Sequence, residues 1–417
     1  MEKKNIARLL FLLLPLGCLF YLLCHQMTNN EASGAVQEEA VGNPSDMEIT
    51  LEVSLSDALK SFAGTHATDS IFKSALNSAE KNQGKTQGDF MDHFAEAFKS
   101  NGHPLSSLFS DSELNKQINS STSDEKVIKI LKKEVKNTTD QTINILRSRL
   151  KKLGISKPEI RSTEVEGQIH IKLLDIKSPE RIRKMLISPG NLEFWETYKL
   201  SEIITNVEAV NTMARGLEST PELVKMDSLF KILSIDFDKN SNSYYSSEIG
   251  RAETKDTAVI SSYFKLAKEE KLIPADLHPA WCPNRNSDGQ KSFSLIALRS
   301  TGKTGKAAMS GNLTQEAKAE FYEEEKESAI TINMTPQAAK DWQALTGRSI
   351  NNTIGIVLDG LVYCYPRVNC EISCGRCQIV GEFTFKEAND LANLLNTGQL
   401  PVSVKIIEEK VTDSAKK

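Results

Sequence analysis

The chain has 417 residues, of which 39% are hydrophobic and 25% are charged, a balance that is ordinary for a globular protein with more than one domain. The formal net charge is −4 and no stripe of Lys and Arg is visible, which argues against binding to a nucleic-acid backbone. No phosphate-loop, serine-hydrolase, zinc-protease or dinucleotide motif is complete. We therefore expect neither an enzyme nor a cofactor.

The first residues are typical of a membrane anchor. An apolar run at 6–24 is close to the length that spans a bilayer, and basic residues stand at its start while acidic residues follow it. This charge order predicts a cytoplasmic N-terminus at 1–5, one uncleaved transmembrane helix at 6–24, a linker at 25–46 and an outward-facing remainder. The alternative is a cleaved signal peptide.

Residues 47–198 predict the first half of an α+β base with a helical insertion at 54–136. The expected elements are a strand at 47–53, a helix capped by Thr138 and Gln141 that ends at Gly154, strands at 159–163 and 168–173, a helix started by Ser178-Pro179, and a strand at 192–196. The order β-α-β-β-α-β is that of a split βαβ, or ferredoxin-like, unit.

The same order is expected to return after an inserted head. Residues 199–306 carry helical patterns and one strand and predict a mixed head subdomain. Residues 307–408 predict the second half of the base, as a duplicate split βαβ unit, and 409–417 a polar tail. The elements of this second half are a strand at 329–334, a helix opened by Thr335-Pro336, two hairpin strands, one extra strand at 378–383, a capped helix and a last strand at 402–407. An acidic run at 320–327 is interpreted as a solvated face.

The densest local signals lie in the last third of the chain. Two β-rich runs, 354–358 and 361–365, meet at Asp359-Gly360, which predicts a hairpin. Thr384 with Glu387 has the spacing of a helix capping box. Gly398 and then Pro401 follow the last helical turn, so both ends of this helix are specified.

These runs, IVLDG, V-Y-x-Y-P, I-x-G-x-F-T and E-A-x-D-L-A-N-L-L-x-x-G-x-L-P, resemble the end of the first extracytoplasmic domain of SecD, an accessory subunit of the bacterial Sec protein-export channel, above all in its form fused to SecF. The resemblance implies structural and not catalytic roles for its signature positions. These are Asp359, Gly360, Pro366, Gly381, Thr384, Glu387, Gly398 and Pro401.

The resemblance also implies partners and a location. They are Sec translocon subunits and unfolded exported proteins outside the inner membrane, with attachment to that membrane by the N-terminal helix. The family's later membrane helices, which hold its proposed proton-coupling residues, have no counterpart after residue 408, so we expect the domain without them. Leu173-Leu174-Asp175 stands where the family usually has Leu-Pro-Gly, and we expect a differently built turn there. A paralogue that docks on the Sec complex without touching substrate is an alternative.

Four cysteines crowd into one short stretch, and the family does not share them. They are Cys364, Cys370, Cys374 and Cys377. The main hypothesis is two local disulfides, Cys374 with Cys377 and Cys364 with Cys370, as an oxidising compartment favours. Unpaired thiols and a four-thiolate zinc site are alternatives. A redox site at Cys374 and Cys377 is weaker, because these thiols do not lie at a helix N-terminus.

Overall fold

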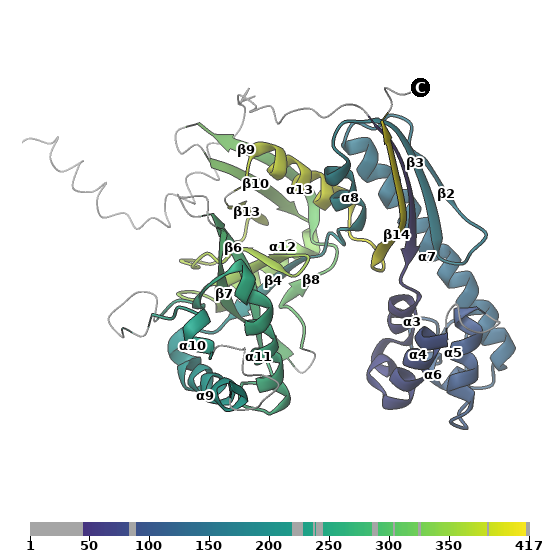
Figure 1. Ribbon diagram of the computed structural model, residues 1–417, viewed down its shortest axis with the longest axis horizontal. Helices are drawn as coiled ribbons and strands as arrows, with labels where there is room; N and C mark the ends of the chain where they lie inside the picture. Colours follow the sequence, from purple (N-terminus) through teal and green to yellow (C-terminus); the bar gives the residue numbers. More distant parts are fainter. Residues whose placement is uncertain are drawn as a thin grey trace, which may run out of the picture. The chain divides into compact units, whose positions relative to one another are not determined.

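The computed structural model describes residues 45–82, 89–218, 228–236, 238, 245–285, 291–302, 305–323, 327–381 and 383–413. It is an α+β structure with three antiparallel sheets (Figure 1). The chain divides into two compact units. We call Glu38–Gly190 with Thr397–Lys417 the terminal unit, and Asn191–Asn396 the central unit.

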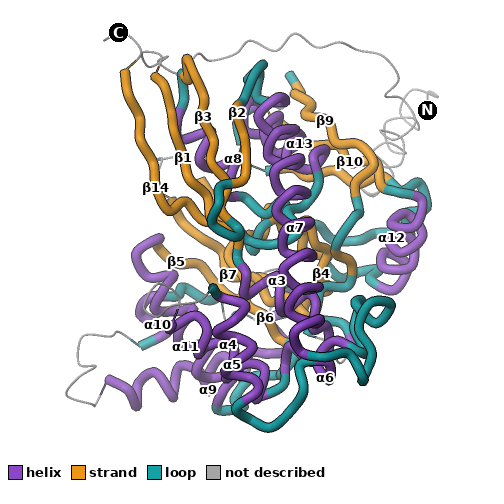
Figure 2. The backbone as a smooth tube through the Cα atoms, turned by 90° about the vertical axis from the view of Figure 1, so that its right-hand side faces the viewer, coloured by secondary structure: helices purple, strands orange, loops and turns teal. Residues whose placement is uncertain are grey.

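The terminal unit is built on a four-stranded sheet of order β14-β1-β3-β2. The strands are β1 (Ser45–Val53), β2 (Glu159–Ser162), β3 (Gln168–Ile176) and β14 (Val404–Asp413), which Figure 2 shows side by side. Alternate residues of β1 are buried, as expected for a sheet with one covered face. Met47, Ile49 and Leu51 are fully buried there and form part of a core that extends into the helices.

Helices fill the rest of the terminal unit. They are α3 (Leu55–Ala63), the 3-10 turn η1 (Gly64–Thr68), α4 (Ser70–Asn82), α5 (Phe90–Lys99), α6 (Ser106–Phe109), α7 (Asp124–Lys152) and α8 (Pro179–Ile187). The expected Ser178-Pro179 start of α8 is confirmed. The expected helix start at Thr138 is wrong, because α7 begins at Asp124 and the Thr138 hydroxyl donates to the carbonyl of Glu134 inside the helix.

The fourth strand of this sheet differs from the expectation. Residues 192–196 were expected to complete the unit, but β14 pairs with β1 from Val53–Val404 to Ser45–Asp413. The strand at 192–197 belongs to the central unit instead. Because β14 continues to Asp413, much of the segment expected to be a polar tail is part of a sheet.

The central unit contains the two other sheets. A seven-stranded sheet has the path β12-β11-β4-β7-β5, with β6 on β7 and β8 on β4. Its strands are β4 (Leu192–Thr197), β5 (Glu248–Glu253), β6 (Leu277–Arg285), β7 (Lys291–Arg299), β8 (Met309–Ser310), β11 (Ile354–Leu358) and β12 (Leu361–Cys364). A three-stranded sheet has the order β13-β10-β9. Its strands are β9 (Thr314–Tyr322), β10 (Glu327–Met334) and β13 (Arg376–Val380).

The helices of the central unit include the two that the sequence specified best. The described helices are α9 (Leu200–Glu218), α10 (Leu229–Ile232), the 3-10 turn η3 (Thr254–Asp256), α11 (Thr257–Glu269), α12 (Pro336–Arg348) and α13 (Phe385–Thr397). Thr335 caps α12 by accepting from the Ala338 amide, with Pro336 in the first turn, as expected.

The expected duplicate of the split βαβ unit does not form as one sheet. Its first strand, β10, pairs with β9 and β13, whereas the hairpin β11–β12 extends the seven-stranded sheet through β4. Its last strand is β14 of the terminal unit. The positions of these strands along the chain were therefore predicted nearly correctly, but the strands with which they pair were not.

The expected transmembrane helix at 6–24 and most of the linker at 25–46 lie outside the described residues. Among the residues that the structure does describe, none of the helices combines the length and the apolar character required to cross a membrane.

Candidate functional site

The Asp359-Gly360 turn is a tight hairpin that also fastens a neighbouring strand. Both residues have positive φ, +53° and +82°, as a type I′ turn requires. The Asp359 carboxylate accepts from the Asn191 amide at 2.7 Å, and the Asp359 amide donates to the Asn191 carbonyl at 3.1 Å. The turn thus holds the start of β4 against the end of β11. At the other end of β11, the Pro366 carbonyl accepts a hydrogen bond from the Ile354 amide at 3.1 Å.

The start of α13 is held by the expected capping box. The Thr384 amide donates to the Glu387 carboxylate at 2.8 Å, and the Glu387 amide donates to the Thr384 hydroxyl at 3.2 Å. Just before it, a Cβ on Gly381 would lie 2.7 Å from the Phe383 ring, so a side chain at this position would require that ring to move. Burial, with the nearby charges of Asp359 and Glu387, raises the pKa of Tyr363 to about 12.

Gly398 and Pro401 lie in the terminal unit, beyond the end of α13. Gly398 has φ +82°, the left-handed conformation that often ends a helix. Its carbonyl accepts from the guanidinium of Arg149 at 3.1 Å. The signature positions therefore do not converge on one cavity: each shapes a turn, a cap or a chain crossing, and these roles are structural.

Arg149 was not singled out from the sequence, although it is fully buried in α7. Its Nη1 donates to the carbonyls of Met185, at 3.1 Å, and Ser188, and its Nη2 donates to those of Pro189, at 3.0 Å, and Gly398. The end of a helix presents unpaired carbonyls and a partial negative charge, so the end of α8 suits a cation. One side chain thus joins α7, the segment after α8 and the segment after α13.

The four clustered cysteines are free thiols in the structure, so the two expected disulfides are not formed. Cys364 ends β12 and Cys377 lies buried in β13, whereas Cys370 and Cys374 are exposed on the loop between these strands. Burial raises the pKa of Cys364 to about 12 and that of Cys377 well above its usual value. Because the thiolate is the attacking species in disulfide exchange, these two are poor candidates for a redox centre.

We expect alkylation to separate these four thiols into two classes. Iodoacetamide at about pH 8 should label Cys370 and Cys374 well before Cys364 and Cys377, because the first two are exposed whereas burial and a raised pKa slow the reaction of the other two. Peptide mass spectrometry of timed samples measures the order, and the denatured chain, in which all four should react, is the control. If Cys370 and Cys374 reacted only after reduction, this result would instead restore the disulfide hypothesis.

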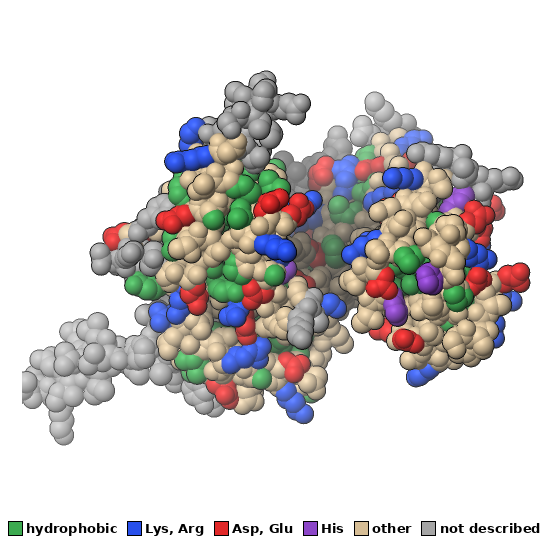
Figure 3. Space-filling model, turned by 90° about the horizontal axis from the view of Figure 1, so that it is seen from below, with side chains coloured by type: hydrophobic (Ala, Val, Ile, Leu, Met, Phe, Trp, Pro, Cys, Tyr) green, Lys and Arg blue, Asp and Glu red, His purple; other side chains and the backbone are tan. Residues whose placement is uncertain are grey.

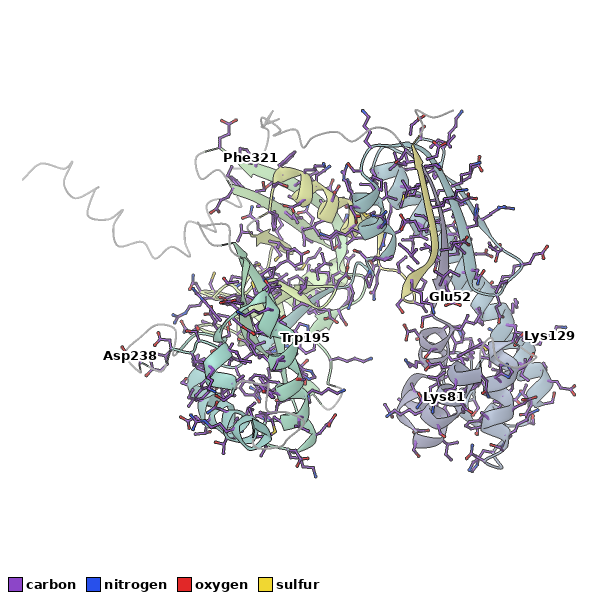
Figure 4. The ribbon with its side chains drawn as sticks, viewed as in Figure 1. Glu52, Lys81, Lys129, Trp195, Asp238 and Phe321 are labelled. Atoms are coloured by element: carbon purple, nitrogen blue, oxygen red, sulfur yellow. The ribbon has the colours of Figure 1, made fainter. Side chains whose placement is uncertain are left out.

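Two further features of the described residues bear on possible chemistry. Within them, no group of three or more His, Cys, Asp or Glu side chains could hold a metal ion. A pocket of about 400 Å³ in the terminal unit is lined by residues that include Glu52, Glu80, Phe90 and Lys405, and two of its three charged groups, Glu52 and Lys405, pair with each other (Figure 4 labels Glu52). On the face drawn in Figure 3, charges of both signs are interspersed without a basic stripe.

Comparisons with known proteins place these features in a family. The model of the SecDF P1 head subdomain matches residues 290–402. The model of the N-terminal part of the P1 domain of protein translocase subunit SecDF matches residues 139–199. These two matches support a SecD P1 domain in this chain. SecD and SecDF are components of protein translocation and not enzymes.

Whole relatives agree with these domain matches. Protein translocase subunit SecD of Rhodothermus marinus is 25% identical over 387 residues, which cover 87% of this chain and 60% of the relative. SecD of Calditerrivibrio nitroreducens is 25% identical over 69% of this chain and 44% of its own length. SecD of Dictyoglomus turgidum is 37% identical over 130 residues, 30% of this chain and 32% of the relative. The chain thus spans 60% or less of the length of each of these three relatives.

Solved structures of the same family are also similar to this chain. One is of a membrane component SecDF that enhances protein export, with 19% identity and a TM-score of 0.38 over 65% of this chain and 92% of that one. SecDF in a super-membrane-facing form has 15% identity and a TM-score of 0.41 over 98% of this chain and 35% of that one.

One departure from the SecD pattern lies at a position with an unusual backbone conformation. Asp175 stands where a glycine was expected from the resemblance, and its φ is +56°. Asp tolerates this left-handed region better than most residues with a side chain. The backbone at this position is therefore in a region that glycine adopts readily, although an aspartate stands there.

Proposed function

We propose that the chain is an accessory component of Sec-dependent protein export that binds unfolded exported chains outside the inner membrane. The observation that carries this proposal is the pair of P1 family matches, one in each unit apart from a few residues at their ends. The P1 head model covers 290–402, which includes most of the segment expected from the sequence to finish the base. We therefore assign the head to the central unit and the ferredoxin-like base to the terminal unit.

The strand order of the terminal unit supports this assignment. In chain order its elements are β1, α7, β2, β3, α8 and β14, and β1 lies between β14 and β3 in the sheet. We interpret this order as a split βαβ arrangement in which β14 supplies the fourth strand. The central unit is then an insertion between α8 and β14, which is how a head would be carried on a base.

The test is photo-crosslinking in cells from single exposed positions of each unit. Glu269 in α11 and Lys318 in β9 report on the central unit, and Lys129 in α7 reports on the terminal unit. Crosslinks from the central unit to many different exported proteins are expected, since an unfolded chain is recognised by its backbone and scattered apolar groups. Crosslinks from the terminal unit alone, and only to Sec subunits, would replace this proposal with a docking paralogue.

Deleting residues 200–306 would not test the proposed function unambiguously. Residues 200–306 include β5, β6 and β7, and β7 joins β4 to β5 in the seven-stranded sheet. Removing them takes out a central strand together with the core around Leu295 and Ala297. Loss of crosslinks in such a variant would report unfolding of the central unit, so single-site crosslinkers are required.

A further inference from the structure

The outer edge of β9 in the central unit is capped at one residue by a side chain. The Asn396 carboxamide, at the end of α13, accepts from the Ala317 amide at 2.8 Å and donates to the Ala317 carbonyl at 2.7 Å. These two bonds are the pair that a residue of an added antiparallel strand would make. Asn396 therefore occupies the place of one peptide group beside β9.

The two bonds fix which backbone groups of β9 face outward. In an antiparallel pair, residues alternate between bonding the partner strand and pointing away from it. Ala317 is paired in register with Ile332 of β10, yet its amide and carbonyl bond Asn396, so it points away from β10. By the same alternation, Ala319 and Phe321 also point their amide and carbonyl groups outward.

In the described part of the chain, no strand lies beside this edge beyond Asn396. Within the described residues, β9 pairs with β10 alone, and neither Ala319 nor Phe321 has a backbone hydrogen bond on the outer side. Figure 4 labels Phe321 towards the far end of this strand. An exposed row of unpaired amide and carbonyl groups is a template for another extended chain.

The side chains along the edge indicate the charge of such a chain. From Thr314 to Glu323 the sequence has three acidic residues, Glu316, Glu320 and Glu323, and one basic residue, Lys318. Lys318 is already paired with Glu316 at 3.3 Å. The excess of negative charge favours a basic extended segment over an acidic one.

We propose that an extended, basic polypeptide segment adds to the central unit as a strand beside Lys318–Tyr322 of β9, next to the Asn396 carboxamide. This inference rests on the proposed function, because it names where and how an exported chain would be held. Recognition through backbone groups suits a partner without a fixed sequence, and Asn396 limits how far along β9 the added strand can extend.

The test uses the full chain and a fluorescein-labelled peptide of alternating valine and lysine, about ten residues long. Anisotropy should show binding, and Ala319→Pro should weaken it at least about tenfold, because proline removes an outward amide yet is tolerated on an edge strand. Ala319→Ser, which keeps the amide, is the matched control. A peptide of alternating valine and glutamate should bind more weakly.

Hydrogen exchange on the unchanged protein keeps the test valid if the proline variant fails to fold. The valine-lysine peptide should slow exchange of the Ala319 and Phe321 amides, which face outward. Unchanged exchange at both amides, or equal affinity in a folded Ala319→Pro variant, would overturn the inference. Crosslinks to exported proteins from Glu269 without protection of β9 would reject this edge alone, whereas the absence of such crosslinks would reject the proposed function.

Discussion

Arg149→Met is expected to destabilise the terminal unit by about 3–5 kcal/mol, one of the two largest effects that we predict for a single substitution. Methionine fills much of the same volume but cannot donate to the carbonyls of Met185, Ser188, Pro189 and Gly398. A buried carbonyl that loses its donor costs about 1–3 kcal/mol. Arg149→Lys should fall in between, because an ammonium keeps the charge but not the forked geometry.

Circular dichroism and tryptophan fluorescence together separate destabilisation of the terminal unit from destabilisation of the central unit. All three tryptophans, Trp195, Trp281 and Trp342, belong to the central unit. In urea, the Arg149→Met variant should lose helical circular dichroism early while tryptophan fluorescence keeps its midpoint. Hydrogen exchange should accelerate in α7 and β1. Lys151→Met, at an exposed position of the same helix, is the control and should change stability by less than about 0.5 kcal/mol. If both signals shift together, Arg149 does more than stabilise its own unit.

Local structure could be predicted where the signal is carried by a few adjacent residues. The Asp359-Gly360 hairpin, the Thr384 and Glu387 capping box and the Ser178-Pro179 helix start each depend on backbone geometry that few residue types satisfy. Such signals act over a few residues and do not depend on what packs against them. Their outcome could therefore be read without knowing the fold.

Strand partners could not be predicted in the same way. The alternation at 192–196 indicates a strand with one face more buried, but it is equally compatible with the sheet of either unit. The choice is made by packing between residues far apart in sequence, such as Val53 with Val404. Because β14 takes the fourth position beside β1, the strand at 192–197 is left for the central unit. Arg149 was missed for the same reason: its four carbonyl partners become neighbours only in the folded chain.

Neither β9 nor the exposure of the thiols could be predicted from local sequence patterns. The segment Thr314–Tyr322 is rich in Ala, Glu and Lys, which favour helices, yet pairing with β10 makes it a strand. The spacing of Cys374 and Cys377 is equally suited to a disulfide, a metal or neither. In the fold one is exposed and the other buried, a difference that spacing alone does not contain.

Phe194→Ala is expected to destabilise the central unit by about 3–5 kcal/mol and leave the terminal unit unchanged. Phe194 lies in β4, is 0% exposed and has its ring centroid 4.9 Å from that of Trp342 in α12. Truncation removes this contact and leaves a cavity where β4, β8 and β11 meet. The fluorescence of Trp342 should report this loss of stability directly, because the urea concentration at the midpoint of unfolding should fall.

The same substitution decides between the observed strand order and the one expected from the sequence. If 192–197 were the fourth strand beside β1, Phe194→Ala would accelerate hydrogen exchange in β1 and β3. With β14 in that position, those strands should exchange as in the unchanged protein, and β11 should be affected instead. Phe194→Leu keeps most of the volume and should cost less than about 1.5 kcal/mol, which shows whether the cavity is the cause. Faster exchange in β1 with no change in β11 would contradict the division of the chain into these two units.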